Sequence, residues 1–289
     1  MPLTILLTVV AMVAFAANSL LARAALAGGA VDAGSFTAIR LVSGALALAV
    51  LLAVRRGRAG FRPVAGDWPS AAALFVYALA FSLAYLRLTA ATGALILFAA
   101  VQGTMVLWGV LRRDRPTRVE LAGLAIAFAA FVYLLLPGLG TPDLQGSLLM
   151  MASGMAWGVY SLRGRGARDP LDATSGNFIR AAAFCVPLAL LAVSTGHATQ
   201  AGIVLAVVSG VVTSGLGYAV WYRVLPRLST TQAATVQLTV PVIAAIGAVA
   251  VLSEVLTGRL VVAALCILGG VALAILSRRP AVSPGRTRP

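Results

Sequence analysis

Long apolar runs separated by short polar breaks make up almost the whole chain. Ten of these runs approach the roughly 20 apolar residues that a helix needs to cross a bilayer. The ten runs cover residues 3–26, 34–54, 69–90, 92–111, 119–137, 145–163, 173–194, 200–222, 231–252 and 259–277. The breaks between them are rich in Arg, Pro and Gly, and Pro and Gly commonly end helices. The pattern therefore predicts an all-α integral membrane protein with ten transmembrane helices.

Composition supports a membrane protein and argues against the function that the net charge first suggests. Hydrophobic residues make up 61% of the chain, charged residues only 10%, and the mean hydropathy is +0.99. Soluble domains carry about 25% charged residues. A net charge of +14 could indicate nucleic-acid binding. The basic residues are instead scattered through the breaks, whereas a nucleic-acid interface needs a clustered basic surface. We expect the lipid bilayer as a partner and no nucleic acid.

The distribution of arginine predicts how the chain is oriented. If the N-terminus is cytoplasmic, 17 arginines fall in the inner loops and the C-terminal tail, and only Arg23, Arg87 and Arg259 fall outside. Positive residues are enriched in cytoplasmic loops of membrane proteins. We therefore expect a multi-pass protein of a bacterial inner membrane with both termini in the cytoplasm. The Arg- and Pro-rich segment 278–289 is expected to be a disordered cytoplasmic tail.

A shift of 140 residues aligns polar positions of the two halves without a gap. The aligned pairs are Arg23 with Arg163, Asp32 with Asp172, Ser35 with Ser175, Ile39-Arg40 with Ile179-Arg180, Asp114 with Glu254 and Thr117 with Thr257. This predicts two five-helix repeats, residues 1–140 and 141–277. Because five is odd, the second repeat must enter the membrane from the opposite side. Inverted repeats that enclose a central site are a recurring transporter architecture.

Several motifs of the second half resemble the drug/metabolite transporter superfamily, and specifically its EamA-type members. These motifs are Ala156-Trp157-Gly158, Arg180, Pro241 and the segment Ser253-Glu254-Val255-Leu256-Thr257. The first half departs from the pattern, with Ala17-Asn18, Val101-Gln102 and Asp114 at the corresponding places. The resemblance covers about residues 5–277 and implies two five-helix repeats and transport of small organic metabolites. Length and aromatic-rich central helices look most like bacterial exporters of aromatic amino acids.

Polar and aromatic side chains in the middle of apolar runs are the candidates for a substrate site. Polar groups inside a membrane are costly unless they face the bundle interior or a wet cavity. Aromatic rings can stack on flat solutes, and amides can bond both groups of an amino acid. Lipid contact, helix packing and interhelical hydrogen bonds are the alternative interpretations. The candidate substrate-binding residues are Asn18, Tyr77, Phe81, Tyr85, Phe98, Gln102, Trp157, Tyr160, Tyr218, Trp221 and Gln237.

The acidic residues bear on energy coupling and on rival functions. All eight lie at or near breaks, where a proton relay across the membrane would not place them. Asp114 and Glu254, near run ends, are expected to cap helices or to pair with neighbouring arginines, and Arg40 and Arg180 are expected to tie helix ends together. We therefore expect a monomeric exporter of amino acids, aromatic ones included, that works by alternating access and facilitated diffusion, without cofactor or metal. A proton-coupled exporter of drugs or other metabolites is one alternative. A non-transporting membrane bundle or a membrane enzyme is another, although the apolar runs lack a catalytic cluster.

Overall fold

A computed structural model describes residues 2–57, 64–111, 117–164, 167–228 and 230–276. These residues are almost entirely helical, and the part of the chain they cover contains one isolated β-bridge, between Val31 and Ala198. The predicted tail 278–289, Asp114 and several of the Arg-rich connections lie outside the described residues. The prediction of an all-α membrane protein is confirmed.

Five long helices match the first five apolar runs. They are α1 (Pro2–Ala27), α2 (Ala33–Arg56), α3 (Trp68–Tyr85), α4 (Ala90–Leu111) and α5 (Arg118–Leu135). Polar residues at their first turns explain several of the boundaries. Asp32 accepts a hydrogen bond from the Ser35 N–H at 2.9 Å, and Thr117 accepts one from the Glu120 N–H at 3.1 Å. Such caps satisfy backbone donors that a helix leaves unpaired at its start.

The second half follows the same order, but three of its apolar runs are broken. Its helices are α6 (Leu144–Gly164), α7 (Pro170–Phe184), α8 (Val186–Thr195), α9 (Gln200–Val208), η1 (Ser209–Leu216), α10 (Gly217–Val224), η2 (Leu225–Arg227), α11 (Thr230–Gln237), α12 (Thr239–Leu252) and α13 (Gly258–Leu276). Pro187 follows the α7–α8 break and Pro241 follows the α11–α12 break. Proline removes one backbone hydrogen bond and clashes with the preceding turn, which accounts for both breaks.

Length and hydropathy identify membrane-crossing helices in most of these positions. Within the described residues, eight segments are long and apolar enough to span a bilayer, and α9 to η2 form one of them. The two remaining predicted runs correspond to α6 and to α7 with α8. The 15-residue α7 is short and carries Asp172, Asn177 and Arg180, which lowers its hydropathy. The total of ten crossings stays a prediction.

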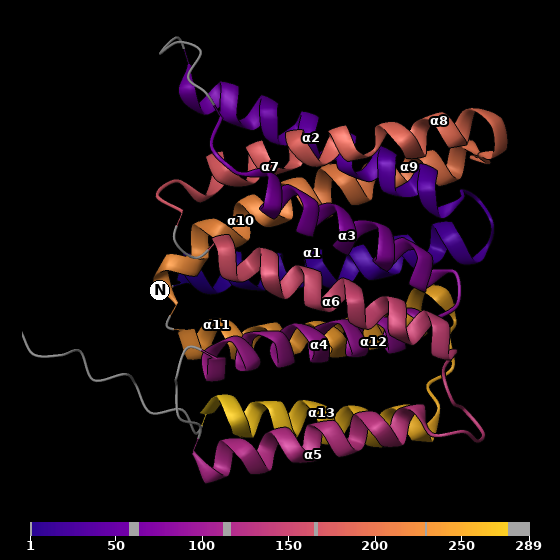
Figure 1. Ribbon diagram of the computed structural model, residues 1–289, viewed down its shortest axis with the longest axis vertical. Helices are drawn as coiled ribbons and strands as arrows, with labels where there is room; N and C mark the ends of the chain where they lie inside the picture. Colours follow the sequence, from indigo (N-terminus) through magenta and orange to yellow (C-terminus); the bar gives the residue numbers. More distant parts are fainter. Residues whose placement is uncertain (1, 58–63, 112–116, 165–166, 229, 277–289) are drawn as a thin grey trace, which may run out of the picture.

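The helices lie roughly parallel and stack in layers, as Figure 1 shows. One side of the bundle is the pair α5 and α13, and the pair α4 and α12 forms the next layer. A Cβ on Gly123 would lie 2.5 Å from the Gly270 carbonyl oxygen, so α5 and α13 touch backbone to backbone at these glycines. Small residues permit such close approach between membrane helices.

One helix from each half of the sequence packs against helices of the other half. Helix α1 packs against α10 and α12 of the second half, whereas α6 packs against α3 and α4 of the first half. The bundle therefore contains two three-helix groups, which we call the α1 group (α1, α10, α12) and the α6 group (α3, α4, α6). Each group combines two helices from one half with one helix from the other half.

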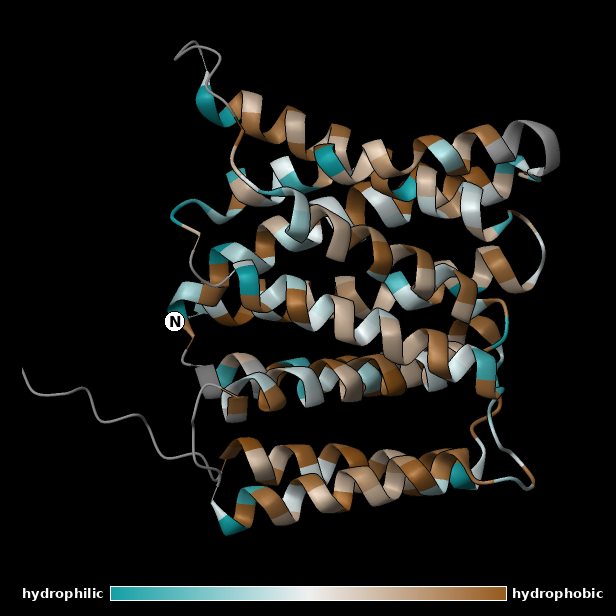
Figure 2. Ribbon diagram, in the orientation of Figure 1, coloured by the Kyte–Doolittle hydropathy of each residue, from teal (hydrophilic) through white to brown (hydrophobic). Residues whose placement is uncertain are grey.

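Polar residues concentrate at the two ends of the helices, and apolar residues cover the length between them (Figure 2). Exposed apolar side chains occur on the outer surface, for example Val50, Phe128 and Leu265. Helix α13 ends at the same end of the bundle where α1 begins (Figure 1). Arg23, Arg87 and Arg259 all lie at the opposite end, next to the ends of α1 and α3 and the start of α13. This arrangement fits a protein that crosses a bilayer along the helix axes.

Candidate functional site: a cavity between two helix groups

A small cavity lies in the middle of the bundle. Its lining residues are Phe15, Asn18, Ser19, Tyr77, Phe81, Leu97, Phe98, Trp157 and Tyr218. Its free volume is about 20 Å³, which is space for a single water molecule. The wall is shared between α1 and α10 on one side and α3, α4 and α6 on the other. The cavity therefore lies between the α1 group and the α6 group.

Aromatic rings form most of the cavity wall, with Trp157 at their centre. The Trp157 ring lies 4.9 Å from Tyr77, 4.9 Å from Tyr218 and 5.4 Å from Tyr160, measured between centroids. Phe15 approaches Trp157 edge-on at 6.3 Å. Aromatic pairs at such separations add about 0.5–1.5 kcal/mol each beyond the burial of their surface. This cluster is rigid enough to present flat apolar faces to a solute.

A hydrogen-bonded polar cluster adjoins these rings. Asn18 accepts from the Ser209 hydroxyl at 2.7 Å and from the Thr213 hydroxyl at 3.1 Å, and its amide donates to the Tyr77 hydroxyl at 3.4 Å. Arg40 donates from Nη2 to the Tyr77 hydroxyl at 2.9 Å. The cluster thus joins α1, α2, α3 and η1, and Asn18 and Tyr77 belong both to it and to the cavity wall.

The serine and threonine hydroxyls of this cluster come from a π-helix. Eight residues, Ser209–Leu216, adopt this wider helix between α9 and α10. Backbone hydrogen bonds in such a helix join residues i and i+5. The Ser209 hydroxyl donates to Asn18, while Ser214 accepts a hydrogen bond from Arg40 Nε at 3.1 Å. A Cβ on Gly210 would lie 2.3 Å from the Arg40 carbonyl oxygen, so only glycine lets α2 come this close. π-Helical segments are frequent at functional sites.

Arg40 brings a positive charge into the bundle interior. The residue is 1% exposed, and its guanidinium stacks on the faces of Tyr77 and Phe81, 5.1 and 4.9 Å from their ring centroids. Its guanidinium donates hydrogen bonds to the hydroxyls of Tyr77 and Ser214. Its Nη1 has no hydrogen-bond partner. A charged residue within a membrane helix costs about 3 kcal/mol on insertion scales, so this arrangement is not expected from packing alone.

Comparisons with known proteins agree with this architecture. Residues 144–276 match the EamA-like transporter family. The chain belongs to this family. An uncharacterized protein of Pseudomonas aeruginosa is 54% identical over 275 residues, which is 95% of each chain. Like the family description, the names of two more distant relatives refer to transport.

The named relatives differ in what their names specify. A "probable amino-acid metabolite efflux pump" of Salmonella typhimurium is 25% identical over 70% of this chain and 73% of its own length. An "uncharacterized transporter" of Archaeoglobus fulgidus is 28% identical over 61% of this chain and 63% of its own length. One crystal structure shares the fold, with a TM-score of 0.67 at 22% identity, and the match covers 96% of this chain and 99% of that one.

The EamA-like bundle brings six of the eleven predicted substrate-binding residues together at the cavity. These six are Asn18, Tyr77, Phe81, Phe98, Trp157 and Tyr218. The other five are buried without lining it, and they are Tyr85, Gln102, Tyr160, Trp221 and Gln237. Tyr85 packs edge-on against Phe81 at 4.7 Å, near the end of α3. Whether any of the eleven binds a solute stays a prediction.

Two of those five residues, Tyr160 and Trp221, extend the aromatic cluster. Tyr160 continues the stack beyond Trp157, and Trp221 meets Phe15 edge-on at 5.9 Å. Gln237 ends α11, and its side-chain oxygen is buried without a partner. Gln102 is 2% exposed in α4, one turn beyond Phe98.

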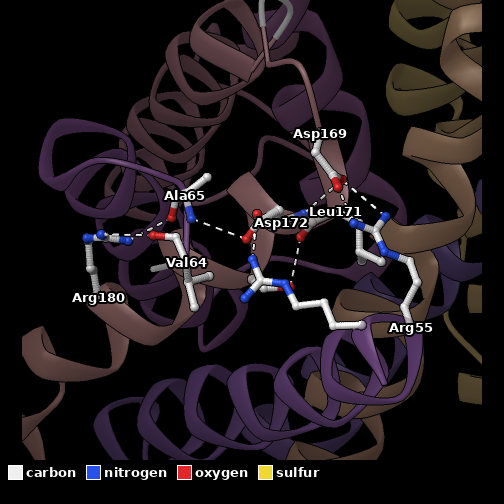
Figure 3. Close-up of polar contacts among 9 residues, drawn as sticks. Arg55, Val64, Ala65, Asp169, Leu171, Asp172 and Arg180 are labelled. Carbon is white, nitrogen blue, oxygen red and sulfur yellow. Dashed lines mark hydrogen bonds and ion pairs between the residues drawn. The ribbon is translucent and has the colours of Figure 1, made fainter. Parts of the chain in front are cut away.

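Sequence reasoning did not place Arg40 beside the cavity, where its guanidinium contacts Tyr77 and Phe81 of the cavity wall. The sequence suggested that Arg40 and Arg180 tie helix ends together. Arg180 does so, because it donates to the Ala65 carbonyl at 2.9 Å and to the Val64 carbonyl at 3.4 Å (Figure 3). Arg40 instead lies seven residues into α2, about 10 Å from its start at 1.5 Å per residue. The sequence offered no signal that separates the two arginines, because Arg180 likewise lies deep in its helix, ten residues after the start of α7.

The bundle end that faces away from the termini is held by a second polar cluster. Arg23 Nε pairs with Glu254 at 3.1 Å, and its Nη1 donates to the Tyr85 carbonyl at 3.1 Å. Glu254 also accepts from the Ala90 N–H at 2.9 Å and so caps α4. Ser253, with a left-handed φ of 53°, turns the chain between α12 and Glu254. The sequence prediction that Glu254 caps a helix or pairs with arginine is confirmed.

Ion pairs also hold the end where the termini lie. Arg55 pairs with Asp169, and Arg56 with Asp172 at 2.7 Å, which ties α2 to the start of α7. Figure 3 shows Arg55 and Asp169 on one side of this network and Arg180 on the other. The Arg55 guanidinium holds the pKa of Asp169 below its usual value. At both ends of the bundle several arginines thus pair with carboxylates, whereas Arg40 pairs with none of the described carboxylates.

The His, Cys, Asp and Glu side chains of the described residues bear on catalysis and metal binding. Within residues 2–276, gaps aside, no three His, Cys, Asp or Glu side chains lie close enough to hold a metal ion. Cys185 is buried and Cys266 is exposed, and the two are not bonded to each other. Rings, hydroxyls and an amide line the cavity that the described residues form, and the Arg40 guanidinium lies against Tyr77 and Phe81 of its wall.

Proposed function

We propose that the protein exports amino acids, aromatic ones included, across a bacterial inner membrane by alternating access. The observation that carries the proposal is the aromatic cavity between the α1 group and the α6 group. Its position at mid-bundle is where transporters of this architecture bind solutes. Trp157, Tyr77 and Tyr218 offer ring faces to an aromatic side chain, and Asn18 offers an amide to the backbone groups of an amino acid.

The exchange of helices between the halves supports a rocking mechanism. Under the 140-residue shift, α1 corresponds to α6, and α10 and α12 correspond to α3 and α4. The contacts of α1 with α10 and α12 then correspond to those of α6 with α3 and α4. This reciprocity is what inverted repeats predict. Rocking of the α1 group against the α6 group would open the cavity alternately to each side.

The charge distribution supports the orientation and the absence of ion coupling. The described arginines at the ends of α2 and α6 and around α10 lie with the termini, which favours a cytoplasmic N-terminus. Seven of the eight acidic residues lie in the described part, and all are at helix ends. Without a carboxylate at the cavity, flux is expected to follow the solute gradient. The name of the Salmonella relative agrees with an amino-acid substrate.

The test is transport of radiolabelled L-phenylalanine by purified protein in proteoliposomes. We expect saturable flux that persists when the proton gradient is collapsed, and whose KM for L-phenylalanine rises with Trp157→Ala. Strict dependence on the proton gradient would instead favour the proton-coupled alternative. Absence of flux for every amino acid tested, in protein shown to be folded, would contradict the proposed substrate class.

A further inference from the structure

Arg40 is the one arginine of the central cavity region, and its charge is not neutralised within the described chain. Seven acidic residues are described, and each is engaged away from it. Asp32, Asp67 and Glu120 cap helices, and Asp143, Asp169, Asp172 and Glu254 pair with arginines. The eighth, Asp114, lies outside the described residues, beyond the end of α4. An anion from outside the chain is therefore the missing partner.

The groups around Arg40 are arranged to donate hydrogen bonds to such an anion. The Tyr77 hydroxyl accepts from Arg40 Nη2 and from the Asn18 amide, and it also lies within hydrogen-bond reach of the Tyr218 hydroxyl. Arg40 Nη1 and the Ser19 hydroxyl are buried without partners. Tyr77, Asn18 and Ser19 line the cavity. A guanidinium next to several free donors is a match for a carboxylate, which accepts up to four hydrogen bonds.

We propose that Arg40 and the Tyr77 hydroxyl bind the carboxylate of the transported solute. The assignment rests on the proposed function in taking the solute to be an amino acid, but requires only that the solute is a small organic carboxylate. The ring of an aromatic substrate then lies against Trp157, whose centroid is 4.9 Å from that of Tyr77. The ammonium group contributes less to binding, because no carboxylate lines the cavity.

A purely structural Arg40 is the alternative that the experiment must separate. In that case Arg40 would only join α2, α3 and η1 through Tyr77 and Ser214. Substitution would then lower thermal stability and affect all solutes equally. A carboxylate-binding Arg40 predicts instead that the chemistry of the solute decides whether Arg40 matters.

The first arm uses wild-type protein and three probes with the same phenyl ring. L-phenylalanine has both charged groups, 3-phenylpropanoate has only the carboxylate, and L-phenylalaninamide has only the ammonium. Binding is measured with purified protein by the shift of its melting temperature and by quenching of tryptophan fluorescence. We expect the two carboxylates to bind within about 10-fold of each other, and the amide at least about 10-fold more weakly, since hydrogen bonds to charged groups contribute that much.

The second arm compares Arg40→Met and Arg40→Lys with Arg180→Met. Arg180 holds the matching position of the second half and binds backbone carbonyls far from the cavity. We expect Arg40→Met to lose about 10- to 100-fold in affinity for both carboxylates and little for the amide. Arg40→Lys keeps the positive charge but lacks the forked guanidinium, so its affinity for both carboxylates should fall between those of the wild type and Arg40→Met. Arg180→Met should bind all three probes like the wild type.

The outcomes separate this assignment from the proposed function. If 3-phenylpropanoate binds through Arg40 but no amino acid is transported, the amino-acid proposal fails and the assignment stands. If the amide binds to wild-type protein as well as L-phenylalanine does, the assignment is overturned. It is likewise overturned if neither carboxylate binds. The wild-type arm decides the question even if the Arg40 variants do not fold.

Discussion

The centre and the ends of this bundle use arginine in opposite ways. At the ends, Arg23, Arg55 and Arg56 each meet a carboxylate of another segment. At the centre, Arg40 meets hydroxyls and ring faces, and one of its nitrogens has no partner. Ion pairs at the ends stabilise one arrangement of the helices, whereas an unneutralised charge at the centre is available to a solute. The difference separates the residues that hold the conformation from those that bind.

The largest loss of substrate affinity is expected from placing a carboxylate next to Arg40, as at the ends of the bundle. In Ser214→Asp, a carboxylate replaces the hydroxyl that lies 3.1 Å from Arg40 Nε. The new ion pair should occupy the guanidinium and reduce L-phenylalanine affinity by about 100-fold, the upper range for a hydrogen bond to a charge. Affinity is measured by tryptophan quenching. Ser214→Asn is the uncharged control of similar size, and equal affinity of the two variants would show that the charge of Arg40 is not used.

A smaller rise in KM, confined to aromatic substrates, is expected when an aromatic ring is removed from the cavity wall. Trp157→Ala removes the ring that contacts both Tyr77 and Tyr218 at 4.9 Å. Loss of about 1–1.5 kcal/mol of ring contact raises KM for L-phenylalanine about 10-fold. KM for L-alanine should change less than about twofold. Trp68→Ala, at the exposed start of α3, is the matched control and should leave both KM values unchanged.

Breaking an ion pair at one end of the bundle should change the transport rate rather than substrate binding. Glu254 joins Arg23 of α1 to the start of α4, so it connects the α1 group to the α6 group at one end. Glu254→Gln weakens this connection by about 1 kcal/mol, the usual range for a partly exposed pair. The maximal flux in proteoliposomes should change up to about fivefold, with KM constant. Asp143→Asn, which breaks the more exposed pair with Arg87, should leave flux unchanged. A changed KM without a changed flux would refute the division between ends and centre.

The smallest effect, on protein stability, is expected from breaking the ion pair Arg55–Asp169, whose side chains are 46% and 39% exposed. Asp169→Asn should lower stability by less than about 1 kcal/mol at pH 7. Arg55 lowers the pKa of Asp169 in the folded protein, so the stabilising contribution is present above the ordinary value of 3.8. It is lost as the pH falls through the lower folded value. The melting temperatures of wild type and variant should therefore differ slightly at pH 7 and converge once the pH has fallen below the pKa of Asp169 in the folded protein.

The sequence predicted the helices and the types of residue at the cavity, but not which of those residues meet there. Runs of apolar residues determine helix position directly, because backbone groups in lipid must be paired within a helix. Which face of α4 or α11 points inward depends on packing between distant segments, so Gln102 and Gln237 were grouped with Phe98. The π-helix of Ser209–Leu216 left no recognisable sequence signal. Arg40 was assigned to a helix end because its contacts come from three other helices.

The most direct measurement is a crystal structure with 4-bromo-L-phenylalanine bound. The anomalous signal of bromine locates the ring, and the remaining density locates the carboxylate. The account predicts one molecule between the α1 group and the α6 group, with its ring against Trp157 and its carboxylate within hydrogen-bond distance of Arg40 Nη1 and the Tyr77 hydroxyl. A molecule bound elsewhere, or bound in the cavity with its carboxylate turned away from Arg40, would contradict it.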